Sequence, residues 1–182
     1  YRAGYGFHAS LMRNPFTKGF DRLKNEQNQL IIFSDMGSGQ IETIDSLGCH
    51  AIILDHHQYL GAQTSKNIIQ INANQCGADG NYEVSGATLS YLFAQALHPA
   101  NEDLAPLALA GATGDKQFIG GVRGLNKTIL EDAVRNGFLT EQTSIKLYGE
   151  TIADALFYTV DPYYPGLSGN REKIDSFLEQ VG

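Results

Sequence analysis

Three short apolar runs constrain the fold of this chain more than any other feature of its sequence. They are Leu30-Ile31-Ile32-Phe33, Ala51-Ile52-Ile53-Leu54 and Ile68-Ile69-Gln70-Ile71. Continuous apolar runs of this length are typical of strands buried on both faces of a parallel sheet. Between the first two runs, Ile41, Ile44 and Leu47 follow helical spacing, and Gly48 is placed to end that helix. We therefore predict neighbouring parallel strands near residues 30–34, 51–55 and 68–71.

After residue 85 the sequence changes to helical patterning. Apolar residues share one face from Ser85 to Leu97, a second apolar helix is expected over 104–112, and Asn126 is placed to cap a third. Later helices are expected over 151–157 and 171–181. This order predicts the α/β class: an open parallel sheet flanked by helices, with a helical C-terminal part. We expect a single domain over 1–182, with a sheet-forming part at about 1–115 and a helical part at about 116–182.

Acidic and histidine residues follow two of the predicted strands. Asp35 follows the first, and Asp55, His56 and His57 follow the second, while Asp115 follows the second apolar helix. Residues just past the carboxyl ends of strands line the ligand crevice of open α/β sheets. Singly, such residues are more often turn formers, helix caps or surface groups. Together they favour a centre for Mn²⁺ or Mg²⁺, ions that take carboxylate and, for Mn²⁺, imidazole ligands and that support phosphoryl hydrolysis.

The charge of the chain limits its partners. The formal net charge is −7, and Lys and Arg are scattered, without the basic stripe of a typical nucleic-acid binder. Either the substrate is small, or the basic surface lies on another part of the protein. No apolar run approaches the length of a membrane span, so no membrane partner is expected. Cys49 and Cys76 lack metal or redox spacing, which favours a cytoplasmic location.

The ordered set of motifs resembles the DHH phosphoesterase superfamily and, within it, RecJ-like single-strand-specific exonucleases of archaeal type. Asp35, within Phe33-Ser34-Asp35-Met36-Gly37, is similar to the second motif of the family. Asp55-His56-His57 is similar to the third, and Asp115, within Gly111-Ala112-Thr113-Gly114-Asp115, to the fourth. The resemblance covers about residues 30–170 and includes the segments 71–74, 85–87 and 161–169.

This resemblance implies a DHH catalytic domain with two Mn²⁺ (or Mg²⁺) ions in the intact protein. It implies that Asp35 bridges the ions and that His56 and Asp115 each ligate one. It further implies that Asp55 supports the triplet, while His57 contacts the substrate phosphate or lies in the outer shell.

Two motifs of the family have no counterpart in the chain. The first family motif is of the His-x-Asp-x-Asp type, and no Asp-x-Asp occurs in this sequence. Gly120-Gly121 is not followed by the histidine of the Gly-Gly-Gly-His element of the C-terminal substrate-binding domain. We therefore expect the chain to be incomplete at its N-terminus and to lack that domain. By itself it is predicted to bind metal weakly and to be nearly inactive, because its remaining ligands are too few for two ions.

The predicted function is a Mn²⁺-dependent phosphodiesterase or exonuclease of RecJ type that hydrolyses single-stranded DNA or RNA, or short oligonucleotides. The alternative is a catalytically inactive RecJ-like scaffold subunit, partnered by the proteins of a DNA replication complex. A relative that cuts a small compound such as pyrophosphate or a cyclic dinucleotide also stays open. The presence of Asp35, His56 and Asp115 favours an enzyme, because a scaffold has no need of metal ligands.

Overall fold

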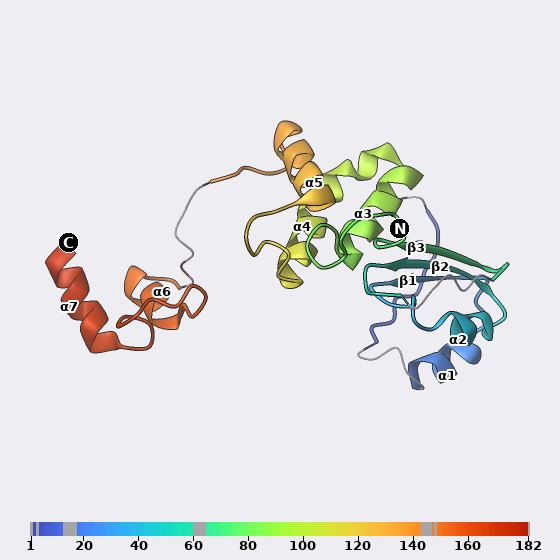
Figure 1. The fold of residues 1–182 in the computed structure, drawn as a ribbon, viewed down its shortest axis with the longest axis horizontal. Helices are drawn as coiled ribbons and strands as arrows, with labels where there is room; N and C mark the ends of the chain where they lie inside the picture. The colour runs from blue at the N-terminus through green and yellow to red at the C-terminus, as the bar shows by residue number, and fades with distance from the viewer. Residues whose placement is uncertain are drawn as a thin grey trace. The chain divides into compact units, whose positions relative to one another are not determined.

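A computed structural model describes residues 2, 4–12, 18–59, 65–142, 147 and 149–181. The chain forms two compact units, Tyr1–Thr140 and Glu141–Gly182 (Figure 1). The first unit contains a parallel sheet with helices on both faces, and the second is helical. None of the helices in the described ranges is both long and apolar enough to cross a membrane. The predicted α/β class, with a helical C-terminal part, is confirmed.

The sheet is parallel and follows sequence order. Its strands are β1 (Leu30–Ser34), β2 (His50–Asp55) and β3 (Ile68–Asn72), in the order β1-β2-β3. The predicted neighbouring parallel strands are therefore confirmed, with bounds that differ by a residue at most. The Asp35 backbone N–H continues the β1–β2 ladder by donating to the Leu54 carbonyl at 2.9 Å. This register places Asp35 beside the Asp55-His56-His57 triplet at one edge of the sheet.

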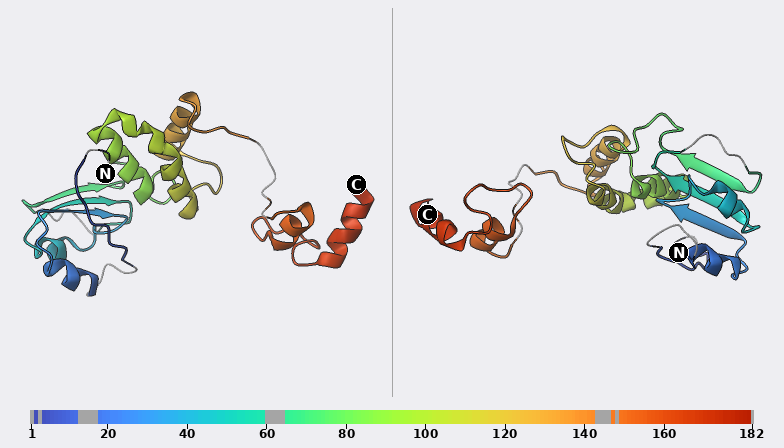
Figure 2. Two further views of the ribbon diagram at one scale, coloured as in Figure 1. Left: turned by 180° about the vertical axis from the view of Figure 1, so that it is seen from behind. Right: turned by 60° about the horizontal axis from the view of Figure 1, so that its bottom comes forward.

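Helices cover the two faces of the sheet (Figures 1 and 2). On one face lie α1 (Lys18–Lys24) and α2 (Ile41–Asp45), and on the other lies α3 (Gly86–Leu97). The buried cluster beneath α1 and α2 contains Phe20, Leu23, Phe33, Ile41, Ile44, Ala51 and Ile53. The cluster beneath α3 contains Leu54, Ala73, Val84 and Leu89. The central strand β2 contributes to both clusters and is the best-buried strand of the sheet.

Further helices pack against α3 on the side away from the sheet. A 3₁₀ segment (Pro99–Leu104) leads into α4 (Ala105–Gly114), and α5 (Gly124–Arg135) follows. Their shared cluster contains Tyr91, Ala105, Ala108, Ile129 and Ala133. Ser85 caps α3, because its hydroxyl accepts a hydrogen bond from the Thr88 backbone N–H at 3.1 Å. This cap fixes the end of α3 that points at the carboxyl edge of the sheet.

The predicted burial of the strands on both faces is wrong for β1 and β3. Leu30 is 51% exposed, Ile32 is 49% exposed and Ile69 is 62% exposed. β1 and β3 are the edge strands of the described sheet, and the apolar cluster under α3 includes Leu54 and Ile71 near the carboxyl ends of their strands. The row formed by Ile32, Ile52 and Ile69 lies farther from that end, so α3 leaves its outer members exposed. An apolar run of this length thus marks a strand without fixing how much of it is covered.

Truncating one residue from each environment tests this burial pattern. Ile53→Ala should lower the free energy of unfolding by about 2–5 kcal/mol, because Ile53 is fully buried in the cluster under α1 and α2. Ile32→Ala should cost less than about 1 kcal/mol, because roughly half of that side chain is already in water. Urea unfolding followed by far-UV circular dichroism measures both, and equal losses would contradict the exposure of β1.

The predicted capping role of Asn126 is also wrong. Helix α5 begins at Gly124, and Arg123 occupies its N-cap position without a side-chain hydrogen bond. Asn126 lies inside the first turn, where its side chain is buried and bonded to Thr88 and Gln117. An Asn near a helix start is commonly a cap, but here tertiary hydrogen bonds take its amide instead.

The second unit contains α6 (Ile152–Tyr158) and α7 (Arg171–Val181), in agreement with the helices predicted for that region. Ala155, Leu156 and Ile174 are buried between them. Arg171 at the start of α7 pairs with Asp154 of α6 at 2.5 Å, which ties the two helices together.

Candidate metal centre

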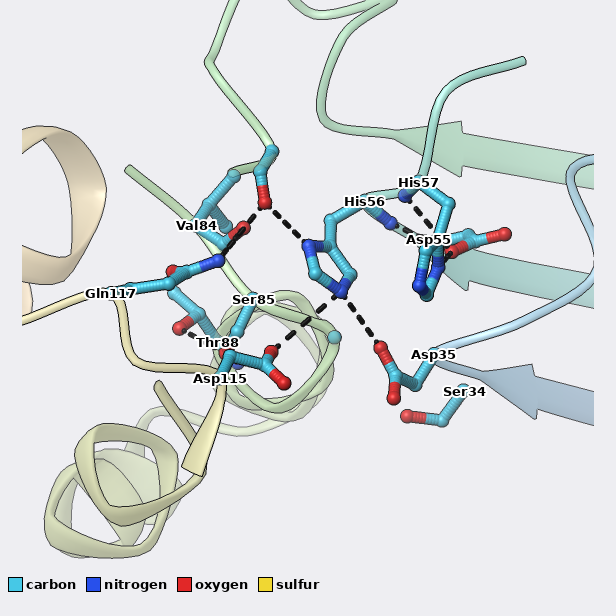
Figure 3. A network of polar contacts seen from close by, with 12 residues as sticks. Ser34, Asp35, Asp55, His56, His57, Val84, Ser85, Thr88, Asp115 and Gln117 are labelled. Atoms are coloured by element: carbon cyan, nitrogen blue, oxygen red, sulfur yellow. Dashed lines mark hydrogen bonds and ion pairs between the residues drawn. The ribbon is translucent and has the colours of Figure 1, made fainter. Parts of the chain in front are cut away.

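Two carboxylates converge on one nitrogen of His56. The Nε2 atom of His56 lies 2.9 Å from Oδ1 of Asp35 and 3.6 Å from Oδ2 of Asp115 (Figure 3). Asp35 directly follows β1, His56 follows β2, and Asp115 caps the C-terminus of α4. The side chain of His56 is 11% exposed and that of Asp35 is 52% exposed. The structure therefore brings the three predicted metal ligands together at a place that solvent can reach.

The backbone at Asp35 has an uncommon conformation. Asp35 has φ 64°, in the left-handed region that residues other than glycine seldom adopt and that is enriched at functional sites. Its carboxylate lies against the start of α3: a Cβ at Gly86 would be 2.6 Å from Asp35 Oδ1 and 2.9 Å from its Cα. The partial positive charge of a helix N-terminus favours a carboxylate there. The absence of a side chain at position 86 thus makes room for Asp35.

The ring orientation of His56 is set by a backbone carbonyl. His56 Nδ1 lies 2.5 Å from the Gly80 carbonyl oxygen, which can only accept, so Nδ1 carries a proton. Metal-binding histidines commonly have one ring nitrogen fixed in this way, with the other nitrogen free for the ion. Gly80 must be glycine, because a Cβ there would lie 1.9 Å from the His56 carbonyl oxygen.

The electrostatics of His56 fit a cation site. The hydrogen bond with Asp35 raises the pKa of His56 from 6.5 to about 9; burial opposes this rise, and the Gly80 carbonyl and the charge of Asp115 add to it. Without a metal ion, the ring is therefore an imidazolium at neutral pH, with its Nε2 proton facing carboxylates. A divalent cation in place of that proton would meet the same oxygen atoms and the Nε2 lone pair. The donor set suits a Mn²⁺- or Mg²⁺-type ion.

Asp115 shows that negative charge is crowded at this place. Burial raises the pKa of Asp115, and the nearby charge of Asp35 raises it further, while His56 and His57 act in the opposite direction. A carboxylate whose ionisation is disfavoured by a neighbouring negative charge is stabilised by a nearby cation. The chemistry of the residues therefore fits a bound metal ion.

Asp55 is turned into the protein instead of toward the carboxylates. It is buried and accepts hydrogen bonds from the backbone N–H groups of Ser38, His56 and His57 and from His57 Nδ1. Burial by itself raises the pKa of Asp55, but these hydrogen bonds outweigh it, and the pKa lies below its usual range. Asp55 is thus an ionised anchor for the loop that follows β2, and its part in catalysis stays a prediction.

His57 is the exposed partner of Asp55. Its Nδ1 donates to Asp55 Oδ1 at 2.7 Å, which leaves Nε2 for other contacts. One ligand atom from each of Asp35, His56 and His57 lies within 4.8 Å of the others. Two possible trios therefore share Asp35 and His56 and differ in the third member, Asp115 or His57. We favour Asp115, because its carboxylate needs a counter-charge and His57 is already oriented by Asp55.

Several residues that support the site were not singled out for this role from the sequence. Asn74 Nδ2 donates to the carbonyls of His56 and His57, and Asn72 Nδ2 also donates to that of His57. Asn72 ends β3, as Asp35 follows β1, so its place at a strand end was a usable signal. Gly80 and Gln117 carried no signal in the sequence, because their contacts depend on how loops fold back on the sheet.

The raised pKa of His56 predicts how metal binding depends on pH. Because the ion replaces the Nε2 proton, the association constant for Mn²⁺ should rise about tenfold per pH unit up to about pH 9 and then level off. In the metal-free protein, the raised pKa adds stability that is complete below pH 6.5 and is lost as the pH rises from 6.5 to about 9. Calorimetric titration and urea unfolding between pH 6 and 9.5 measure these trends, with His56→Gln as the control that should remove both.

The comparisons with known proteins agree with this geometry. Residues 5–112 match the family described as DHH family, N-terminal domain. The chain is also 35% identical over 183 residues to an uncharacterized protein of Methanocaldococcus jannaschii, an alignment that covers 97% of this chain and 41% of that relative. The chain thus spans about two fifths of the length of the curated relative it matches. Because the matched family region covers more than half of the chain and includes the Asp55-His56-His57 triplet, this protein belongs to the DHH family, whose members are generally metal-dependent phosphoesterases.

Proposed function

We propose that this protein is a metal-dependent phosphodiesterase of RecJ type, which hydrolyses single-stranded nucleic acid or short oligonucleotides with Mn²⁺ or Mg²⁺. The observation that carries the proposal is the approach of Asp35 and Asp115 to His56 Nε2, with Nδ1 held by the Gly80 carbonyl. An inactive scaffold would gain nothing from an exposed carboxylate pair that needs a cation. Membership of a family of phosphoesterases supports the same direction.

The residues of the proposed site have different roles. Asp35, His56 and Asp115 would hold the first ion, and Asp35 is the proposed bridge to a second, because a carboxylate offers two oxygen atoms. When bound, the ions supply an activated water and charge stabilisation for phosphoryl transfer. Asp55 holds the backbone of the triplet, so that His56 and His57 keep their positions.

His57 is proposed to contact the phosphate of the substrate. Its Nδ1–H is donated to Asp55, and its ring is largely exposed, so Nε2 is the atom that an incoming phosphate would meet. Asp55 fixes the imidazole in one orientation, with Nε2 left for an incoming group. His57 would therefore orient the scissile phosphate.

The charge of the chain supports a substrate that is single-stranded or short. A formal net charge of −7 opposes the broad phosphate contacts of duplex binding. A short segment placed over a cationic centre needs fewer such contacts, because the ions carry the attraction. Proteins of a replication or repair complex are proposed as partners that would bring longer substrates to the site.

A panel of labelled substrates tests the proposal in the full-length protein. With Mn²⁺, we expect mononucleotides to be released from single-stranded DNA or RNA or from a short oligonucleotide, with little release from a duplex. Chelation with EDTA should stop the reaction, and added Mn²⁺ should restore it. Pyrophosphate and a cyclic dinucleotide belong in the same panel.

The outcomes separate the candidate functions. Hydrolysis restricted to pyrophosphate or the cyclic dinucleotide would assign a small-phosphate substrate instead. Tight Mn²⁺ binding without hydrolysis of any member of the panel would point to the scaffold subunit. Hydrolysis that persists in EDTA would contradict the metal centre itself.

A further inference from the structure

A buried glutamine connects two of the proposed metal ligands. Gln117 lies two residues after Asp115, and its side chain is 2% exposed. Its Nε2 donates to the Gly80 carbonyl at 2.9 Å and to the Val84 carbonyl at 3.2 Å (Figure 3). Its Oε1 accepts from Asn126 Nδ2 at 2.6 Å. The amide therefore uses both of its N–H groups and its oxygen inside the protein. Such full use of a buried amide fixes its position closely.

The Gly80 carbonyl is the point where Gln117 and His56 meet. That oxygen accepts from His56 Nδ1 at 2.5 Å and from Gln117 Nε2 at 2.9 Å. Both of its lone pairs are thereby used. Gln117 thus fixes the acceptor that fixes the His56 ring, while its own backbone continues directly from Asp115.

The hydrogen bonds that lead to Gln117 from Ser85, Thr88 and Asn126 all run in the same donor-to-acceptor direction. Thr88 Oγ1 donates to Asn126 Oδ1 at 2.6 Å, so the Ser85 hydroxyl, 3.0 Å from Thr88 Oγ1, must be the donor in their contact. Asn126 then donates to Gln117, and Gln117 donates to Gly80. Hydrogen bonds aligned in this way polarise and strengthen one another in a buried setting.

This series of hydrogen bonds lies next to all three segments that carry a proposed metal ligand. It begins at Ser85, next to the Gly86 that packs against Asp35, and it ends at Gly80, which holds His56. Gln117 lies on the turn that carries Asp115. A buried polar frame of Ser85, Thr88, Asn126 and Gln117 therefore shares the Gly80 carbonyl with His56 at the end of β2, continues from Asp115 after α4, and adjoins the Gly86 that packs against Asp35 after β1.

We infer that Gln117 is a positioning residue for the metal centre, which holds His56 and Asp115 in the separation that an ion requires. The inference rests on the proposed function, because it assumes that these residues bind a metal ion. Outer-shell partners of metal-binding histidines typically contribute ten- to a hundredfold to metal affinity. Gln117 would act on the ion through the Gly80 carbonyl, without touching it.

The test compares Gln117→Met with Ile129→Val in the full-length protein. Methionine keeps the length and apolar volume of Gln117 but cannot donate to Gly80. Ile129→Val removes buried volume from α5, which also carries Asn126, without removing any bond of the frame. We expect Gln117→Met to weaken Mn²⁺ binding, measured by calorimetric titration, by about ten- to a hundredfold. Ile129→Val should lower the Tm and leave Mn²⁺ affinity unchanged.

A second measurement reports the histidine ring directly. With diamagnetic Zn²⁺ as the probe ion, long-range ¹H–¹⁵N spectra should show wild-type His56 with a proton on Nδ1 and coordination through Nε2. Gln117→Met should give a mixture of ring states at His56. If that variant does not fold, Thr88→Val removes a donor farther along the frame and should weaken Mn²⁺ binding, while Ile129→Val leaves it unchanged.

Each outcome decides the inference. Wild-type affinity and ring state in Gln117→Met would overturn it while leaving the proposed function intact. Equal loss of affinity in Gln117→Met and Ile129→Val would also overturn it, because the effect would then follow stability alone. Failure of the wild-type protein to bind Mn²⁺ would overturn the proposed function and the inference together.

Discussion

Asp35→Asn is expected to abolish metal-dependent hydrolysis, lowering kcat/KM by at least about a thousandfold, equivalent to roughly 4 kcal/mol of transition-state stabilisation. The amide matches the carboxylate in shape but carries no charge and offers one oxygen instead of two. It therefore cannot bridge two ions or stabilise one beside His56. The same substitution removes the largest cause of the raised pKa of His56, so that pKa should fall from about 9 toward its usual 6.5.

The expected loss is measured with a labelled single-stranded oligonucleotide, together with a Mn²⁺ titration of the same sample. Asp21→Asn, an exposed substitution on α1, is the matched control and should change neither rate nor affinity. His56→Ala should reproduce the loss, because it removes the nitrogen on which the carboxylates converge. Wild-type rates in Asp35→Asn would refute the assigned site, whatever the family of the chain.

The sheet was predictable because its signal is local. Each strand is a short apolar run that ends where polar residues begin, and parallel order follows from the helix between the first two runs. Burial was less predictable, since Ile32 and Ile69 depend on how far α3 extends across the sheet. How far α3 covers the sheet is set by tertiary packing and cannot be predicted from the apolar runs alone.

The candidate site was predictable to the extent that strand ends mark it. Asp35 and the Asp55-His56-His57 triplet were found because the carboxyl ends of neighbouring parallel strands lie side by side. Asp115 belongs to a helix end and not to a strand end; it was included in the predicted set because its carboxylate is a suitable ligand, and the resemblance to the fourth family motif supported that choice. The distance of 3.6 Å between Asp115 Oδ2 and His56 Nε2 depends on the tertiary fold, so local sequence does not predict it.

The polar frame of Ser85, Thr88, Asn126 and Gln117 could not be predicted from the sequence. Asn126 is a plausible helix cap by its position, and nothing local indicates that it bonds Gln117 and Thr88 instead. The sequence also gives no sign that Gly80 and Gly86 must be glycine. That need arises because His56 packs against Gly80 and Asp35 packs against Gly86 in the folded protein. Contacts that join segments far apart in the chain depend on the whole fold, and here such contacts surround the predicted metal ligands.

Gly86→Ala is expected to weaken Mn²⁺ binding by about a hundredfold, although alanine is the better helix former by up to about 1 kcal/mol. A Cβ at position 86 would lie 2.6 Å from Asp35 Oδ1, 2.7 Å from its Cβ and 2.9 Å from its Cα. Because a backbone atom is among these contacts, rotation of the side chain cannot relieve the clash. Asp35 already has φ 64°, so the β1–α3 contact must open and carry the carboxylate away from His56.

Gly114→Ala provides the matched control for this experiment. Gly114 ends α4 beside Asp115, and a Cβ there would meet no atom within 4 Å. That variant should keep wild-type Mn²⁺ affinity and gain slightly in Tm, whereas Gly86→Ala should lose affinity even where its Tm is unchanged. If the added methyl group displaces Asp35, Mn²⁺ affinity should fall without a matching fall in Tm. Loss of folding would instead lower both. If Gly86→Ala binds Mn²⁺ as Gly114→Ala does, then the close approach of α3 does not position Asp35.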